Sequence, residues 1–168
     1  MDLQTILGYF QTYGVIAIFV IVFLEYLNLP GFPAGIILPM AGILAKKGDI
    51  SFLQGFLLSV FAGLCGSLLL YFLGRLGGDI FLEKYLHKFP KHRPAILKTM
   101  KYINEKGCFG IFLSKQIPMI RTLISIPAGV LKFQLMNYVI YSTLGIALWN
   151  LVFMGAGYYL GEVVFKMF

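Results

Sequence analysis

Residues 115–129 read KQIPMIRTLISIPAG, and two cations, Lys115 and Arg121, lie in this otherwise apolar or small-residue stretch. Lys115 offers a point charge, whereas Arg121 offers a planar fork of N–H donors that matches the oxygens of a phosphate. A charge at membrane depth costs about 2.5–3.5 kcal/mol on insertion scales, so charges kept there usually serve a function. We therefore expect Arg121 and Lys115 to hold an anionic substrate group.

A single acid, Glu25, lies in the other interrupted apolar stretch, residues 3–45. The simplest arrangement lets Glu25 offset part of the cation charge while the remaining positive charge binds the anion. Glu25 is therefore a third candidate for the substrate site. The alternative is that Lys115 and Arg121 extend to the membrane surface as topology anchors, and that Glu25 is an interfacial carboxylate at a helix end.

The composition indicates an integral membrane protein. The 168 residues are 59% hydrophobic and 12% charged, and the formal net charge is +7. A soluble domain of this size carries about twice that proportion of charge. Basic residues are better assigned to cytoplasmic loops and anionic lipid headgroups than to nucleic acid. No clustered metal ligands occur, and no cofactor is expected.

Apolar segments of two kinds alternate along the chain. Residues 3–24, 50–74 and 133–161 are uncharged and long enough to cross a bilayer. Residues 26–45 and 107–131 are also apolar but are interrupted by proline and glycine. Non-helical backbone at membrane depth survives only inside protein or beside a wet cavity, so these two segments predict re-entrant hairpins. The residues expected to shape them are Pro30, Pro33, Pro39, Gly42, Pro118, Pro127 and Gly129.

The chain shows a weak internal repeat at an offset of 87 residues. Gly42 aligns with Gly129, and the YFLG sequence ending at Gly74 aligns with the YYLG sequence ending at Gly161. We predict an all-α membrane protein that forms one domain over 1–168. Repeat one covers about 26–75, a basic cytoplasmic loop with an amphipathic helix covers 76–106, and repeat two covers about 107–161.

The positive charge predicts the orientation. Residues 75–106 hold eight of the fourteen Lys and Arg residues, which places this segment in the cytoplasm. The two hairpins then enter from opposite sides, as in the inverted repeats of many transporters. The N-terminus falls inside and the C-terminus outside. This orientation leaves Lys46 and Lys47 outside, against the charge rule.

Four stretches resemble the DedA family, whose membrane domain is shared with the VTT proteins: LEYLNLPGFPAGIILPMAG, GSLLLYFLGRLGG, KQIPMIRTLISIPAG and LWNLVFMGAGYYLG. The resemblance covers roughly 14–161. The family typically has Arg-x-x-Pro-x-x-Arg before Pro-Ala-Gly, and here Lys115 stands at the first Arg. A second acid usual in the first hairpin is also missing, because Ala34 follows Pro33. This absence puts coupling through two carboxylates in doubt.

The resemblance implies a multi-pass lipid transporter of the bacterial cytoplasmic membrane, a flippase that returns a phosphate-bearing lipid from the outer to the inner leaflet. Phosphatidylethanolamine and undecaprenyl phosphate are the two substrates considered. The zwitterion fits one acid and a reduced arginine count slightly better. Protons are a possible coupling ion. The sequence does not predict an oligomeric state.

Three other functions stay open. A proton-coupled exporter of small solutes or ions would use Glu25 as the proton carrier. A non-transport assembly factor would not need Arg121. An enzyme is the least expected, since a lipid phosphatase needs a histidine nucleophile with an acidic partner. The only histidines, His87 and His92, lie in the basic loop without such a context.

Overall fold

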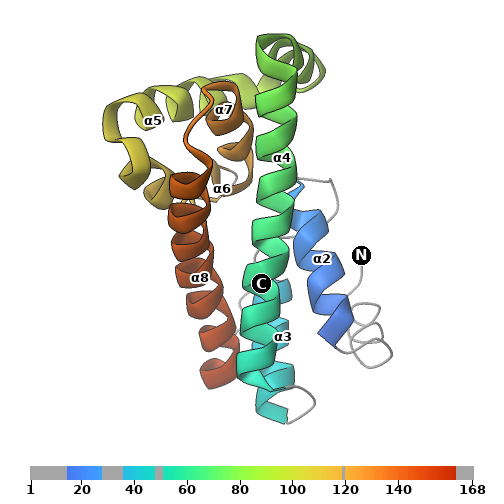
Figure 1. Cartoon of the computed structure of the whole chain (residues 1–168). Coiled ribbons are helices and arrows are strands. Elements are labelled where there is room, and N and C mark those ends of the chain that lie inside the picture. The colour runs from blue at the N-terminus through green and yellow to red at the C-terminus, as the bar shows by residue number, and fades with distance from the viewer. Residues whose placement is uncertain (1–14, 28–35, 48–50, 119, 162–168) are drawn as a thin grey trace. The chain divides into compact units, whose positions relative to one another are not determined.

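The computed structural model describes residues 15–27, 36–47, 51–118 and 120–161 (Figure 1). Every regular element among these residues is helical, as predicted. The elements are α2 (Val15–Tyr26), α3 (Ile37–Lys47), α4 (Phe52–Lys88), the 3-10 turn η1 (Pro90–His92), α5 (Arg93–Ser114), α6 (Ile120–Leu123), α7 (Ser125–Val130) and α8 (Leu135–Leu160).

Two helices are long and apolar enough to cross a membrane, Phe52–Gly78 within α4 and Leu135–Leu160 of α8. They match the predicted spans 50–74 and 133–161. Both expose large apolar side chains along their length, including Leu57, Phe72 and Leu144. Such contiguous apolar exposure is unusual on a soluble protein, and it suits helices that face lipid. The predicted span 3–24 lies only partly within the described residues.

Glycines break the two helices on either side of the polar segment. Gly78 in α4 and Gly107 in α5 both have φ of 54°, which L residues rarely adopt. Each long ribbon is therefore two helices joined at a kink. Between the kinks lies the polar segment, and its second half is helical as predicted. That helix buries Ile96 and Ile103 and exposes Lys98.

The broken apolar segment 107–131, predicted to form the second hairpin, is divided into short pieces. Helix α5 ends at Ser114, a turn follows, and the short helices α6 and α7 are separated by a turn at Ile124. In the first hairpin, α2 ends at Tyr26 and α3 begins at Ile37. Re-entry of either hairpin into the membrane stays a proposal.

The chain divides into two compact units. The first consists of residues 1–63 and 147–168, and the second of residues 64–146. The first unit therefore holds α2, α3, the start of α4 and the end of α8. The second unit holds the rest of α4, the elements from η1 to α7, and the start of α8.

The same kind of close contact between two helices, made at glycine, occurs inside each unit. In the first unit, a Cβ atom on Gly42 would stand 2.0 Å from the Met154 carbonyl oxygen, and one on Gly157 would stand 2.0 Å from that of Pro39. In the second unit, a Cβ on Gly129 would stand 2.0 Å from the Tyr71 carbonyl oxygen. Each hairpin helix thus touches the backbone of a long helix through glycine.

The glycine contacts of the two units can be compared with the predicted repeat, which stays a prediction. A Cβ on Gly74 would stand 2.3 Å from the Ile126 carbonyl oxygen, and one on Gly157 would stand 2.0 Å from that of Pro39. If the two units are repeats, these contacts pair Gly74 with Gly157, about one helical turn from the Gly161 that the sequence alignment pairs with it.

Candidate functional site

Lys115 lies just after α5 and is fully buried in the second unit. Its Nζ donates to Ser67 Oγ at 2.9 Å, to the Arg121 carbonyl oxygen at 2.9 Å and to Ser125 Oγ at 3.4 Å. An ammonium group has three donors, and three acceptors from α4 and the hairpin surround this one. The predicted cation is therefore present at depth, where polar groups of the protein compensate its burial.

Tyr138 of α8 extends the network around Lys115. Its hydroxyl lies 2.8 Å from Ser125 Oγ and 3.2 Å from the Ser67 carbonyl oxygen, and its ring centroid is 5.9 Å from Lys115 Nζ. The ring stacks on Tyr71 with centroids 4.5 Å apart. These contacts join α4, α7 and the start of α8 around one ammonium group.

The hairpin turn is also fixed against α8. A Cβ on Gly145 would stand 2.6 Å from Lys115 Cβ, so only glycine leaves room for the lysine stem. Next along the chain, Gln116 Nε2 donates to the Gly145 carbonyl oxygen at 2.9 Å. The absence of a side chain at Gly145 thus allows the turn to lie on the helix.

Arg121 lies in the short helix α6, which follows the turn that begins at Lys115, and is 1% exposed. Its backbone N–H donates to the Ile117 carbonyl oxygen at 2.9 Å, and its own carbonyl accepts from Lys115. The two predicted cations thus belong to one connected structure. Through that carbonyl, Lys115 helps to set the position of the Arg121 backbone.

Glu25 is 4% exposed near the end of α2, beside the fully buried Tyr26. It belongs to the first unit, whereas Arg121 belongs to the second, and their pairing stays a prediction. The first unit also contains a buried polar contact, in which Asn150 Nδ2 of α8 donates to Ser59 Oγ of α4 at 3.0 Å. A carboxylate and an amide are thus both buried in this largely apolar unit.

The residues predicted to shape the hairpins occupy three kinds of position. Pro39 and Pro127 are each the third residue of a helix, α3 and α7, where a missing N–H breaks no intrahelical hydrogen bond. Pro118 is exposed in the turn before α6. Gly42 and Gly129 make the close backbone contacts. Pro30 and Pro33 lie outside the described residues.

Comparison with known proteins decides the family. The family model of the VTT domain matches residues 32–159. The chain belongs to the VTT domain family, which includes DedA. No solved structure matches the chain.

Three relatives of this VTT protein, all from bacteria, carry different names. It is 32% identical to undecaprenyl phosphate transporter A of Staphylococcus aureus over 151 residues, 88% of this chain and 74% of the relative. It is 31% identical to an alkaline phosphatase-like protein of Lactococcus lactis over 164 residues, 95% of this chain and 76% of the relative. It is 28% identical to Protein DedA of Escherichia coli over 150 residues, 87% of this chain and 68% of the relative.

Sequence reasoning missed three polar residues of this VTT protein, Ser67, Ser125 and Tyr138. All three are fully buried and touch Lys115 or each other. A signal was available, because each is a hydrogen-bonding side chain within an otherwise apolar segment. That signal does not reveal which polar residues meet, since they come from α4, α7 and α8.

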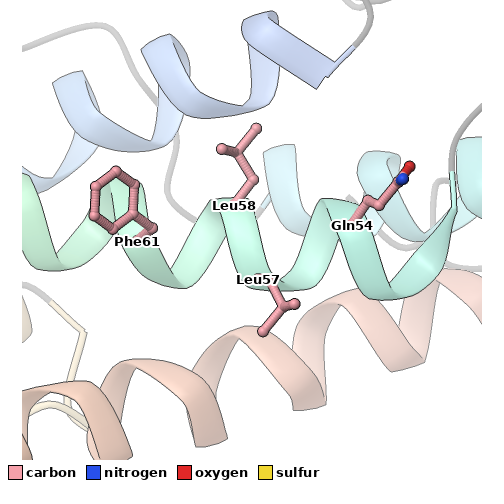
Figure 2. A pocket seen from close by; sticks show the side chains of 4 residues that line it. All are labelled: Gln54, Leu57, Leu58 and Phe61. Atoms are coloured by element: carbon pink, nitrogen blue, oxygen red, sulfur yellow. The ribbon is translucent and has the colours of Figure 1, made fainter.

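A shallow apolar hollow of about 560 Å³ lies on α4 in the first unit of the VTT protein. Figure 2 shows its four labelled side chains, Gln54, Leu57, Leu58 and Phe61, all on this helix. Phe61 is 57% exposed, and its ring centroid lies 6.0 Å from that of Phe19 in α2. The hollow suits a hydrocarbon chain and has one polar amide, at Gln54.

Proposed function

We propose that this protein moves a phosphate-bearing lipid across the bacterial cytoplasmic membrane. The observation that carries the proposal is a buried arginine, Arg121, in a short helix whose backbone Lys115 holds by a hydrogen bond. A chain so poor in charge keeps few cations at this depth, and arginine is the side chain best suited to phosphate. The relative from Staphylococcus aureus, named as a transporter of a lipid phosphate, supports the same function.

In this proposal the two cations have different roles. Arg121 contacts the phosphate through its guanidinium. Lys115 has three acceptors within the protein, so it positions the turn rather than touching the headgroup itself. Because Arg121 is covered, the headgroup reaches it only after the hairpin has moved. Alternating exposure of a central site is the way transporters with repeated broken hairpins work.

The hydrocarbon part of the lipid stays in the bilayer beside the protein. The apolar hollow at Leu57 and Phe61 on α4 offers one surface for such a chain (Figure 2). Contact there is weakly selective, because lipid tails resemble one another. Selectivity is therefore assigned to the headgroup site.

We favour a polyprenyl phosphate over phosphatidylethanolamine as substrate, moved from the outer to the inner leaflet. The name of the Staphylococcus aureus relative supports this choice and outweighs the slight preference for a zwitterion that the residue count gives. Inward movement of one negative charge against an inside-negative potential costs about 2.3 kcal/mol per 100 mV. A co-moving proton would cancel that cost, and Glu25 is the carboxylate proposed to carry it.

A phosphatase is the second candidate, because the Lactococcus lactis relative is named alkaline phosphatase-like. Among the described contacts, His92 Nδ1 lies 3.0 Å from the Tyr85 hydroxyl, whereas Lys115 bonds to serines and a carbonyl. The histidine and the buried cation thus have separate partners. We therefore propose a non-enzymatic protein, and release of inorganic phosphate from a lipid phosphate would contradict this.

The test is lipid movement in proteoliposomes of the purified protein. Labelled polyprenyl phosphate and phosphatidylethanolamine are followed in parallel, with Arg121→Ala as the inactive variant and exposed Arg93→Ala as the matched control. We expect the polyprenyl phosphate to cross faster than in empty vesicles, with Arg121→Ala inactive and Arg93→Ala active. Faster crossing of phosphatidylethanolamine alone would identify that lipid as the substrate in place of the polyprenyl phosphate. No movement of either lipid would overturn the proposal.

A further inference from the structure

A cavity lies in the second unit and is lined by residues other than Ser67, Arg121 and Ser125, the acceptors around Lys115. It has a volume of about 180 Å³ and lies between the first part of α5 and the turn that precedes α6. A Cβ on Gly110 would stand 2.8 Å from the Tyr102 carbonyl oxygen, so the two parts of α5 are packed closely beside it. The cavity is lined by Lys98, Thr99, Tyr102, Ser114, Ile117 and Ile120.

The polar groups of this mostly apolar lining are of the kind that bind phosphate. It contains one ammonium group, from Lys98, and three hydroxyl groups, from Thr99, Tyr102 and Ser114, but no carboxylate. Ammonium and hydroxyl groups donate hydrogen bonds to phosphate oxygens, and the ammonium also supplies opposite charge. Thr99 is 3% exposed and Ser114 is 2% exposed, so these hydroxyls are held by the fold rather than on a mobile surface.

The position of the cavity connects it with the proposed headgroup site. Ser114 directly precedes Lys115 in the chain, and Ile120 directly precedes Arg121. The cavity and the buried cations thus involve the same stretch of chain, from the end of α5 to the start of α6. Of the lining residues, Ile117 is 43% exposed, and Ile120 adds a second apolar side chain, so the site favours a lipid over a free solute.

We propose that this cavity binds the phosphate group of a membrane lipid and forms a second headgroup site beside Arg121. The inference rests on the proposed function and adds a place where the lipid waits before or after it reaches the buried arginine. Lys98 contacts the phosphate directly, and the Tyr102 hydroxyl donates a hydrogen bond to the same group.

The test measures lipid binding rather than transport. Binding of a fluorescent polyprenyl phosphate to the full-length detergent-solubilised protein is compared among variants in an Arg121→Ala background, which removes the proposed buried contact. If Arg121→Ala does not fold, Arg121→Lys replaces it. Lys98→Gln is the test variant. Lys101→Gln is the matched control, because the Lys101 side chain is 77% exposed and lies 3.8 Å from Glu105.

We expect Lys98→Gln to weaken binding about tenfold, Tyr102→Phe to weaken it less, and Lys101→Gln to leave it unchanged. Competing polyprenol, which lacks the phosphate, should not displace the probe. Equal effects of the two lysine variants, or displacement by polyprenol, would overturn the inference. Displacement by equimolar inorganic phosphate would show a free-phosphate site and overturn the lipid assignment. Failed transport by the wild type would reject the proposed function and leave these binding results standing.

Discussion

The Lys115 ammonium donates a 2.9 Å hydrogen bond to the backbone carbonyl of Arg121, so one cation of the hairpin holds the backbone of the other. The remaining donors of Lys115 reach hydroxyls of Ser67 and Ser125, which belong to α4 and α7. A lysine with these partners stabilises the turn from inside the protein through three hydrogen bonds. This relation supports the proposal that Lys115 shapes the site and that Arg121 binds the ligand.

Replacing Lys115 by methionine should therefore impair transport without much effect on substrate affinity. The variant leaves three buried acceptors without this donor. Each unsatisfied buried group costs about 1–3 kcal/mol of stability, and removal of a buried charge offsets part of this cost. In the transport assay we expect the maximal rate to fall at least about tenfold while the KM changes less than about threefold.

The control for this prediction is Lys115→Arg, which keeps the charge and hydrogen-bond donors. It should restore part of the rate, limited by the narrow space beside Gly145. If Lys115→Met instead raised the KM strongly at an unchanged maximal rate, Lys115 would be a direct ligand of the headgroup.

The close contacts of Gly42 and Gly129 predict large losses of stability on substitution by alanine. In each case the new Cβ would stand 2.0 Å from a backbone carbonyl oxygen, of Met154 or of Tyr71. Backbone cannot give way as a flexible side chain can, so we expect each variant to lose about 1–3 kcal/mol or more of unfolding free energy. Thermal unfolding in detergent measures the change.

Gly155→Ala is the matched control in α8, because no atom lies within 4 Å of its would-be Cβ. Alanine favours a helix over glycine by about 1 kcal/mol, so this variant should be neutral or slightly stabilised. Equal melting temperatures for Gly129→Ala and Gly155→Ala would mean that the contact between α7 and α4 is looser than described.

The sequence allowed the long helices to be predicted because they depend on local composition. Residues 50–74 and 133–161 lack charge, and helices of the expected kind occupy them. The positions of Lys115 and Arg121 in a broken apolar stretch also indicated depth, and both are buried. These two cations are buried because their neighbours in the chain are nearly all apolar.

The partners of Lys115 could not be predicted in the same way. Ser67 and Tyr138 are far from Lys115 in the sequence, and their meeting depends on how α4 and α8 pack in the second unit. One turn along a helix changes such partners and leaves the hydrophobic pattern nearly the same. Helix breaks depend on the local sequence, whereas hydrogen bonds between helices depend on how distant segments pack.

The kink at Gly107 predicts a conformational cost for any side chain at that position. Its φ of 54° and ψ of −129° lie in a region used almost only by glycine, although no atom lies within 4 Å of a would-be Cβ. Gly107→Ala should lose about 1–3 kcal/mol of unfolding free energy through backbone strain alone. Circular dichroism during thermal unfolding measures this, again against Gly155→Ala. An unchanged melting temperature would mean that the kink is not required.

The hydrogen bond between Asn150 and Ser59 predicts energetic coupling between α8 and α4 in the first unit. Asn150 Nδ2 donates to Ser59 Oγ at 3.0 Å, and Ser59 in turn donates to the Phe56 carbonyl oxygen at 2.8 Å. Both side chains are fully buried, so no water replaces a lost partner. In membrane proteins such bonds contribute about 0.6 kcal/mol on average.

A double-mutant cycle with Ser59→Ala and Asn150→Leu should give a coupling of this size, since either single change removes the bond and the second then removes nothing more. The control pair is Ser59→Ala with Gly155→Ala, which share no hydrogen bond and should be additive. Additivity in both pairs would mean that the packing of the two helices does not depend on this hydrogen bond.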